Sequence, residues 1–273
     1  MKGVLEKSAN KSMDKARILT AAVLLPLLIL AILKGPPFLL LALALLAALI
    51  AWHEYAGMAA LPSQLLWPGC LGLIISFLII WQKGPVLAPG IWLGFFLFML
   101  LFLRRYQAPQ HQQELIKALF GYIYVLLGFS HLFLVLTLPA GRSWFLCLIA
   151  VIFGTDTGAY YAGRILGKHK LSPFISPKKT WEGAFGGTFL GILLGLSLGL
   201  YFKLASVYFL IPIFLLVSVV GQIGDLFESI IKRGFGVKDS GRLLPGHGGI
   251  LDRTDALIFA APLFYWLMVW THG

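Results

Sequence analysis

Apolar stretches, each about as long as a membrane-spanning helix, follow one another along almost the whole chain. The hydrocarbon core of a bilayer is about 30 Å thick, so a spanning helix needs about 20 mostly apolar residues. Short segments rich in Pro, Gly and charged residues separate the stretches, and polar groups interrupt several of them. The pattern predicts an all-α, polytopic integral membrane protein with about nine transmembrane helices, eight and ten being the next counts. The nine stretches lie near residues 18–34, 37–59, 64–81, 87–103, 116–137, 143–163, 183–202, 206–231 and 250–270.

Composition supports a membrane protein and changes how the net charge is interpreted. Only 12% of the 273 residues are charged, whereas a soluble domain has roughly 25% charged residues. The net charge of +11 would suggest a nucleic-acid partner in a soluble protein. In a membrane protein, however, cations gather at the cytoplasmic ends of the helices. We therefore expect no nucleic-acid partner.

The positions of Lys and Arg orient the chain in the bilayer. If the N-terminus is cytoplasmic, only four of the 22 cations lie in outer loops, as the positive-inside rule requires. The first apolar stretch follows five cations, but it is longer than a cleaved signal core and no small-residue cleavage site follows it. We expect an uncleaved first helix, a cytoplasmic N-terminus and, with nine spans, an outer C-terminus. The four outer cations are Lys34, Lys83, Arg142 and Lys203.

The two halves of the chain differ in chemical content. Residues 1–140 hold few chemical groups, and we expect a scaffold that faces lipid or a second subunit. Glu54, at the inner end of the second stretch, is the exception, and a lone interfacial Glu is more often an anchor than a site. Residues 141–273 carry seven of the eleven acids and two long cytoplasmic loops. We expect this half to form the catalytic part.

A stripe of small residues runs along the seventh stretch. Such a stripe allows the backbone of another helix to approach closely, so we assign it to helix packing and not to catalysis. The stripe consists of Gly183, Gly187, Gly191, Gly195 and Gly199, spaced by four residues.

Ionisable residues inside spanning stretches are costly and mark candidate functional sites. Asp156 lies deep in the sixth stretch, Asp225 lies late in the eighth, and Asp252 and Asp255 open the ninth. Such aspartates either relay protons or ions in a transporter, or hold a hard divalent cation whose shell is completed by phosphates. The many Lys and Arg residues of the two neighbouring loops favour phosphate chemistry, because a triphosphate has to be neutralised. The usual soluble nucleotide-binding motifs are absent from the sequence.

Two segments of the second half resemble the phosphatidate cytidylyltransferases, also called CDP-diacylglycerol synthases. Residues 229–255 read SIIKRGFGVKDSGRLLPGHGGILDRTD, which fits the signature of that family at its fixed positions. Residues 156–183 contain DTGAY, GR, GK and SPKKTWEG in the order found in the family. The resemblance is specific across about residues 150–256. The first half agrees in hydropathy, in length and at Glu54.

The resemblance implies that the chain transfers a cytidylyl group from CTP to phosphatidic acid, giving CDP-diacylglycerol and pyrophosphate. It implies Mg²⁺ as the cofactor, K⁺ as a candidate second cation, and a homodimer. It also implies a location in the plasma membrane (the bacterial inner membrane), with the active site facing the cytoplasm. The phosphatidate phosphate would attack the α-phosphate of CTP directly, so the protein must position two anions and stabilise the charge that develops.

The expected catalytic group contains four acids and two cations. We expect Asp225 and Asp252 to be the metal ligands, and ion pairs with Lys232 or Arg253 are the structural alternative. The remaining acids are expected to bind the metal through water or to fix basic side chains. The full group is Asp156, Asp225, Lys232, Asp252, Arg253 and Asp255.

A larger set of residues is expected to contact the substrates. Its basic side chains are candidate phosphate contacts, its hydroxyl groups add hydrogen bonds, and its glycines let backbone N–H groups approach an anion. The set is Arg164, Lys168, Ser176, Lys178, Lys179, Thr180, Ser229, Arg233, Lys238, Asp239, His247, Gly248 and Gly249.

Two other functions fit parts of the pattern. Another membrane nucleotide-lipid transferase or a lipid kinase would use a similar site, but CDP-alcohol phosphotransferases are excluded because their DGxxAR…GxxxDxxxD run is missing. An ion or metabolite transporter would also place acids inside the membrane. Transporters often contain internal repeats, whereas here the acids crowd into one half and no repeat is visible.

Overall fold

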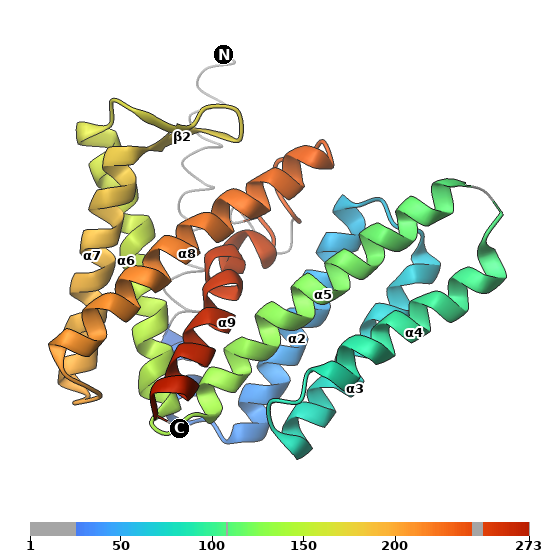
Figure 1. The fold of residues 1–273 in the computed structure, drawn as a ribbon, viewed down its shortest axis with the longest axis horizontal. Helices are drawn as coiled ribbons and strands as arrows, with labels where there is room; N and C mark the ends of the chain where they lie inside the picture. The colour runs from blue at the N-terminus through green and yellow to red at the C-terminus, as the bar shows by residue number, and fades with distance from the viewer. Residues whose placement is uncertain (1–25, 108, 242–247, 273) are drawn as a thin grey trace, which may run out of the picture.

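The computed structural model describes residues 26–107, 109–241 and 248–272. Most residues in these ranges are helical (Figure 1). The helices coincide with the apolar stretches predicted from the sequence. Of the first predicted stretch, residues 18–25 lie outside the described residues, and residues 26–34 are helical. The later helices are α2 (Pro37–Met58), η1 (Ser63–Leu65), α3 (Leu66–Lys83), α4 (Ala88–Arg105), α5 (Pro109–Thr137), α6 (Gly141–Leu166), α7 (Trp181–Tyr201), α8 (Val207–Gly234) and α9 (Leu251–His272).

The described helices have the length and composition of membrane spans. Seven of them are long and apolar enough to cross a bilayer, and Ala88–Arg104 forms a shorter apolar helix. The prediction of a mainly helical, polytopic membrane protein is therefore confirmed. The count of nine spans and the cytoplasmic N-terminus stay predictions.

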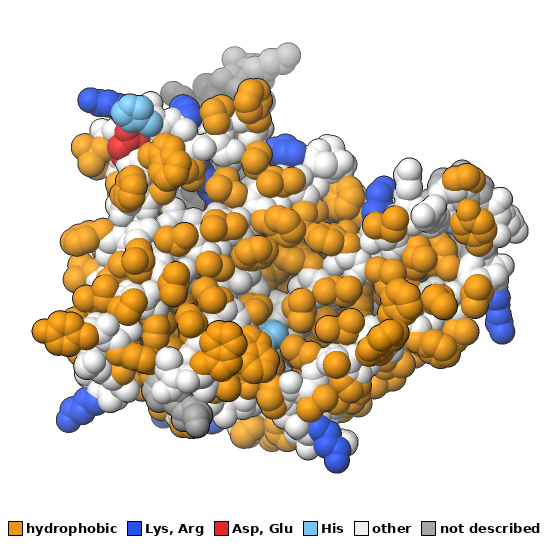
Figure 2. All heavy atoms as spheres, in the orientation of Figure 1, with side chains coloured by type: hydrophobic (Ala, Val, Ile, Leu, Met, Phe, Trp, Pro, Cys, Tyr) orange, Lys and Arg blue, Asp and Glu red, His pale blue; other side chains and the backbone are white. Residues whose placement is uncertain are grey.

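The surface of the molecule matches a lipid environment. In Figure 2, hydrophobic side chains cover a broad middle band, while most Lys and Arg side chains lie along the upper and lower margins. Large apolar side chains are exposed on several helices, among them Trp92, Phe96 and Phe189. Because soluble monomers rarely expose apolar areas of this extent, the band is best explained by contact with lipid.

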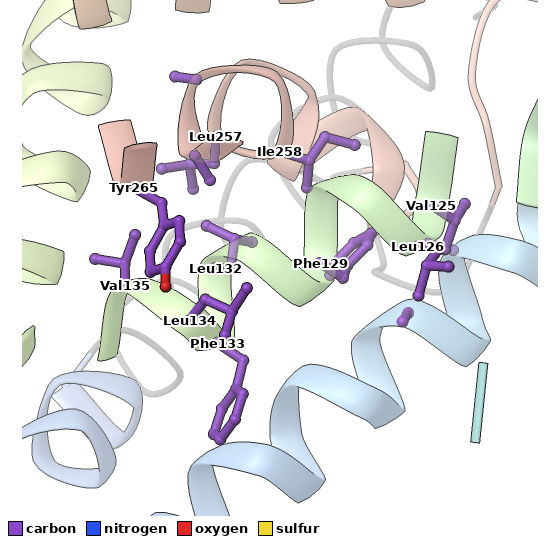
Figure 3. Packing of buried hydrophobic residues seen from close by; sticks show 14 of the residues in the cluster. Val125, Leu126, Phe129, Leu132, Phe133, Leu134, Val135, Leu257, Ile258 and Tyr265 are labelled. Atoms are coloured by element: carbon purple, nitrogen blue, oxygen red, sulfur yellow. The ribbon is translucent and has the colours of Figure 1, made fainter. Parts of the chain in front are cut away.

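The core of the molecule is built around α5, which packs against α2 on one side and against α9 on another. Figure 3 shows buried side chains of α5, including Phe129 and Leu132, beside Leu257 and Ile258 of α9. Gly128 lets the two helices approach, since a Cβ there would lie 2.5 Å from the Cβ of Ile258. Through these contacts, the first half of the chain supports the helix that carries Asp252 and Asp255.

Helices α6 and α7 pack closely along the predicted glycine stripe. All five of its glycines are buried. A Cβ at Gly187 would lie 2.5 Å from the carbonyl oxygen of Thr155, so a side chain there has no room. The prediction of close helix packing is confirmed, and the contact fixes the segment of α6 that carries Asp156.

A β-hairpin connects α6 to α7, where the sequence predicted only a loop. Strand β1 (Lys170–Ser172) pairs antiparallel with β2 (Ser176–Thr180), with Lys170 opposite Thr180. Strands of three and five residues are too short to give a readable alternation of polar and apolar positions. Thr180 ends the hairpin and begins α7, because its hydroxyl oxygen accepts a hydrogen bond from the Gly183 N–H at 3.1 Å.

The order of the helices gathers the polar residues of the second half. Helix α6 ends, α7 begins and α8 ends toward the side of the molecule that carries the hairpin (Figure 1). Residues 235–241, which follow α8, lie toward the same side (Figure 1). The acids and cations that the sequence spreads over about 100 residues therefore come together in space.

Candidate active site

A pocket of about 420 Å³ lies between α6, the hairpin, α7 and α8. Its walls combine carboxylates from two helices with cations from α6 and β2, and Tyr160 lies beside them. Opposite charges in one pocket at the end of spanning helices can bind an anion together with its counter-cation. The charged residues of the lining are Asp156, Arg164, Lys178, Lys179 and Asp225.

An ion pair crosses this pocket. The Nζ atom of Lys179 on β2 lies 2.5 Å from Oδ2 of Asp225 on α8, and the two side chains are 27% and 32% exposed. The pair ties the hairpin to α8 and places a positive charge directly on the Asp225 carboxylate. Because neither partner is fully buried, either could exchange this contact for a ligand.

Two further aspartates face the same region. The carboxylate of Asp156 on α6 interacts electrostatically with Asp225, Lys179 and Arg253. Asp255 on α9 interacts with both Asp156 and Asp225. Three helices thus bring three carboxylates within electrostatic range of one another, an arrangement that repels in the absence of cations.

A second polar cluster joins α8 to α9. The Nζ atom of Lys232 lies 2.6 Å from Oε2 of Glu228 and 2.7 Å from Oδ1 of Asp252. Glu228 is almost completely buried, with a side-chain exposure of 1%. Lys232 follows Asp225 by seven residues, which is about 10 Å along a helix. Asp252 therefore pairs with α8 two turns beyond Asp225.

The other oxygen of Asp252 is also occupied. Its Oδ2 atom accepts hydrogen bonds from the Ser240 N–H at 2.8 Å, the Ser240 hydroxyl at 2.8 Å and the Gly249 N–H at 2.9 Å. Gly248 approaches the same carboxylate with a φ of 80°, a conformation that favours glycine. The Asp252 side chain thus organises the chain on both sides of the segment 242–247.

Glu54 reaches this segment from the first half of the chain. Its buried carboxylate accepts hydrogen bonds from the Ile250 N–H at 2.9 Å and from the Leu251 N–H at 3.0 Å. The expectation that Glu54 is an interfacial anchor is therefore incomplete. It lies near the C-terminal end of α2 as expected, but its partners are in the signature segment near the start of α9.

Within the described ranges, no group of three or more His, Cys, Asp and Glu side chains is placed to hold a metal ion. Mg²⁺ usually takes one or two carboxylates and completes its octahedral shell with water and substrate phosphates. Asp225 and Asp156 fit that requirement, since both line the pocket and Asp225 already holds the ammonium of Lys179. Asp252 would first have to exchange a protein hydrogen bond, and its role as a metal ligand stays a prediction.

The candidate substrate contacts fall into two groups. Arg164, Lys178, Lys179 and Thr180 line the pocket, and the Arg164 guanidinium donates a hydrogen bond to the Tyr160 hydroxyl at 3.2 Å. His247 lies outside the described residues. The other described candidates are not part of the pocket lining: Lys168, Ser176, Ser229, Arg233, Lys238, Asp239, Gly248 and Gly249.

Sequence reasoning did not assign two buried acids to the site, Glu54 and Glu228. For Glu228 a signal existed, because a Glu near the end of a spanning stretch with a Lys four residues later predicts an ion pair. For Glu54 no local signal existed, since its partners Ile250 and Leu251 follow almost 200 residues later.

Comparison with known proteins gives the family. A sequence model described as the Cytidylyltransferase family matches residues 15–271. The phosphatidate cytidylyltransferase of Staphylococcus epidermidis is 37% identical over 267 residues, covering 94% of this chain and 100% of that protein. The phosphatidate cytidylyltransferase of Staphylococcus haemolyticus is 36% identical over 262 residues, covering 93% of this chain and 99% of that protein. The chain therefore belongs to the cytidylyltransferase family and is a membrane-embedded nucleotidyltransferase.

Proposed function

We propose that this enzyme transfers a cytidylyl group from CTP to phosphatidic acid, releasing pyrophosphate and forming CDP-diacylglycerol for phospholipid synthesis. The names of the relatives support this assignment. One structural observation supports the same function for this chain: the pocket combines two aspartates with three cations at one end of apolar helices. A soluble triphosphate and a membrane lipid can both reach such a position.

The reaction requires no covalent intermediate on the protein. An oxygen of the phosphatidate phosphate attacks the α-phosphorus of CTP, and the bond from that phosphorus to the oxygen bridging to the β-phosphate breaks. Pyrophosphate leaves with the electrons of the broken bond. The protein must therefore hold two anions close together and stabilise the charge that develops between them.

The cations of the pocket would perform the first of these tasks. Arg164, Lys178 and Lys179 come from α6 and β2, so they surround the pocket from two elements. Arg binds phosphate through a fork of N–H donors, whereas Lys acts as a compact charge. When the triphosphate enters, Lys179 exchanges Asp225 for a phosphate oxygen and remains charge-paired.

The aspartates would perform the second task. Asp225 and Asp156 would hold Mg²⁺ through carboxylate oxygens, and Asp252 would join them after giving up a hydrogen bond from Ser240 or Gly249. When bound, Mg²⁺ neutralises phosphate charge and polarises the α-phosphate. Asp255 and Arg253 orient these groups from α9. Lys232 keeps the Asp252 carboxylate in place, and a K⁺ ion is proposed as the second cation on the basis of the resemblance.

The setting of the site follows from the distribution of cations. We propose that the hairpin side faces the cytoplasm, because 18 of the 22 Lys and Arg residues fall at the ends assigned to that side. The N-terminus would then be cytoplasmic, the chain would cross the bacterial inner membrane nine times, and residues 141–273 would form the catalytic part. A homodimer is proposed from the resemblance.

A direct assay tests the proposed function. Purified protein in detergent, supplied with CTP, phosphatidic acid and Mg²⁺, should release pyrophosphate, and diacylglycerol in place of phosphatidic acid should support no release. Asp225→Asn should lower the rate by about 100-fold or more, as the loss of a group that stabilises transition-state charge does. Absence of release from folded wild-type protein with any phosphatidate species would refute the assignment.

A further inference from the structure

We propose that Glu54 is a positioning residue for the reaction, which holds the start of α9 in the shape that keeps Asp252 in place. The inference rests on the proposed function. Glu54 lies on α2, in the half of the chain otherwise expected to be scaffold, and its side chain is buried beneath the signature segment. It is not among the residues that line the pocket.

The contacts of Glu54 are specific to one turn of the chain. Oε1 accepts a hydrogen bond from the Ile250 N–H, and Oε2 accepts one from the Leu251 N–H. The preceding amide, that of Gly249, donates to Asp252. Three consecutive amides are therefore divided between two carboxylates, and neither carboxylate can shift without moving the amides that the other holds.

The physics of helix ends explains why a carboxylate is needed here. The first N–H groups of a helix have no partner within the helix, and they carry the positive end of its dipole. In most helices a nearby Ser, Thr, Asp or Asn satisfies them. In α9 the acceptor comes instead from α2, so the cap also joins the two halves of the chain.

The glycines of the signature segment are placed to admit this side chain. A Cβ at Gly249 would lie 2.5 Å from Oε2 of Glu54, and a Cβ at Gly241 would lie 2.8 Å from Oε1. Any larger residue at either position would displace the carboxylate. The space left by these two glycines is thus filled by Glu54, which gives Gly249 a role besides the approach of backbone to phosphate.

Ser240 completes the link between the two carboxylates. Its hydroxyl oxygen lies 2.8 Å from Oδ2 of Asp252 and 3.4 Å from Oε2 of Glu54. A hydroxyl has one hydrogen to donate, so the shorter contact with Asp252 is favoured and Glu54 limits where Ser240 can move. Glu54 therefore acts on Asp252 mainly through the backbone of the turn and also through Ser240.

The variant Glu54→Gln tests the proposal with little change in shape. One of its two oxygens becomes an NH₂ group that faces an N–H donor, so at least one of the two backbone hydrogen bonds is lost. Loss of an outer partner of a metal ligand typically costs 10–100-fold in activity or metal affinity. We expect kcat to fall by about 10–100-fold and the Mg²⁺ concentration for half-maximal rate to rise. KM for CTP should change less than about threefold, because Glu54 is not part of the pocket lining.

Hydrogen–deuterium exchange supplies a readout that does not depend on activity. The amides of Ile250 and Leu251 should exchange faster in Glu54→Gln than in the wild type, while the amides of α5 and α6 should be unchanged. His53→Gln is the matched control, because His53 is the exposed neighbour of Glu54 on the same helix. It should leave both kcat and the exchange pattern as in the wild type.

The outcomes separate this inference from the proposed function. If the wild type does not release pyrophosphate, the proposed function fails, while the exchange experiment still reports on the cap. If the wild type is active and Glu54→Gln retains kcat within twofold, the positioning role is wrong. If Glu54→Gln does not fold, Glu54→Asp decides, since it keeps the charge but is one methylene shorter. We expect an intermediate kcat for it, and a wild-type kcat would overturn the inference.

Discussion

The cluster of Lys232, Glu228 and Asp252 predicts a large loss of stability when its single cation is removed. In Lys232→Met the side chain keeps its approximate length but loses its charge. The carboxylates of Glu228, which is 1% exposed, and of Asp252, which is 10% exposed, then lose the ammonium group that pairs with them. Removing one partner of a buried ion pair typically costs 3–5 kcal/mol. For a protein of this size, 1 kcal/mol changes Tm by roughly 2–4 °C, so we expect Tm to fall by roughly 6–20 °C.

Thermal unfolding of the purified protein in detergent measures this change, and two further variants make it specific. Lys238→Met removes an exposed lysine six residues away and should change stability by less than about 0.5 kcal/mol. The double variant Glu228→Gln/Lys232→Met also removes the buried negative charge, so it should recover much of the lost Tm. A Tm of Lys232→Met within about 2 °C of the wild type would refute the reasoning.

The remaining predictions concern helix packing and the pocket. Gly187→Leu should destabilise the protein by about 1–3 kcal/mol, because its Cβ would meet the backbone of Thr155. In the control Gly57→Ala, nothing lies within 4 Å of the new Cβ, so Tm should stay the same or rise. Equal losses of Tm in the two variants would contradict the packing argument. Lys179→Met should lower kcat/KM for CTP by about 10–100-fold, because a hydrogen bond to a charged group contributes about 1.5–3 kcal/mol. In Lys170→Met, on the neighbouring strand, kcat/KM for CTP should stay within about twofold of the wild-type value. An equal loss in both variants would show that the overall positive charge of the hairpin matters, and not a specific contact of Lys179.

Much of the fold could be predicted because a bilayer imposes a simple rule on the chain. Backbone groups in lipid must be hydrogen-bonded internally, so long apolar stretches become helices. The predicted limits near 37–59 and 206–231 lie within three residues of α2 and α8. The hairpin was missed because it lies outside the apolar stretches, where this rule gives no information, and its strands are too short to show a period.

The site could be predicted only in part. The sequence singled out the acids as candidate functional residues because charge inside a spanning stretch is costly. It also predicted Lys178 and Lys179 as phosphate contacts, and both line the pocket. It could not determine which cation lies beside which acid. That depends on how α8, α9 and β2 approach one another, and the pairing of Asp225 with Lys179 and of Asp252 with Lys232 is visible only in the structure.

The contacts of Glu54 could not be predicted from the sequence for a different reason. Its position near the C-terminal end of α2 was correctly predicted, but its partners lie in a segment that begins 186 residues later. No pattern of hydrophobic and polar positions relates two such segments, because their contact depends on the packing of α2 and α9 around α5. Single-sequence analysis therefore assigned Glu54 the commonest role for its position.

The partition of labelled phosphorus tests the central claim most directly. Purified protein, Mg²⁺ and phosphatidic acid would be incubated with CTP radiolabelled at the α-phosphorus or, in a parallel reaction, at the γ-phosphorus. The account predicts that the α label enters the lipid extract in a one-to-one ratio with released pyrophosphate, while the γ label stays in the aqueous pyrophosphate. Transfer of the γ label to lipid would instead indicate a lipid kinase and would contradict the account.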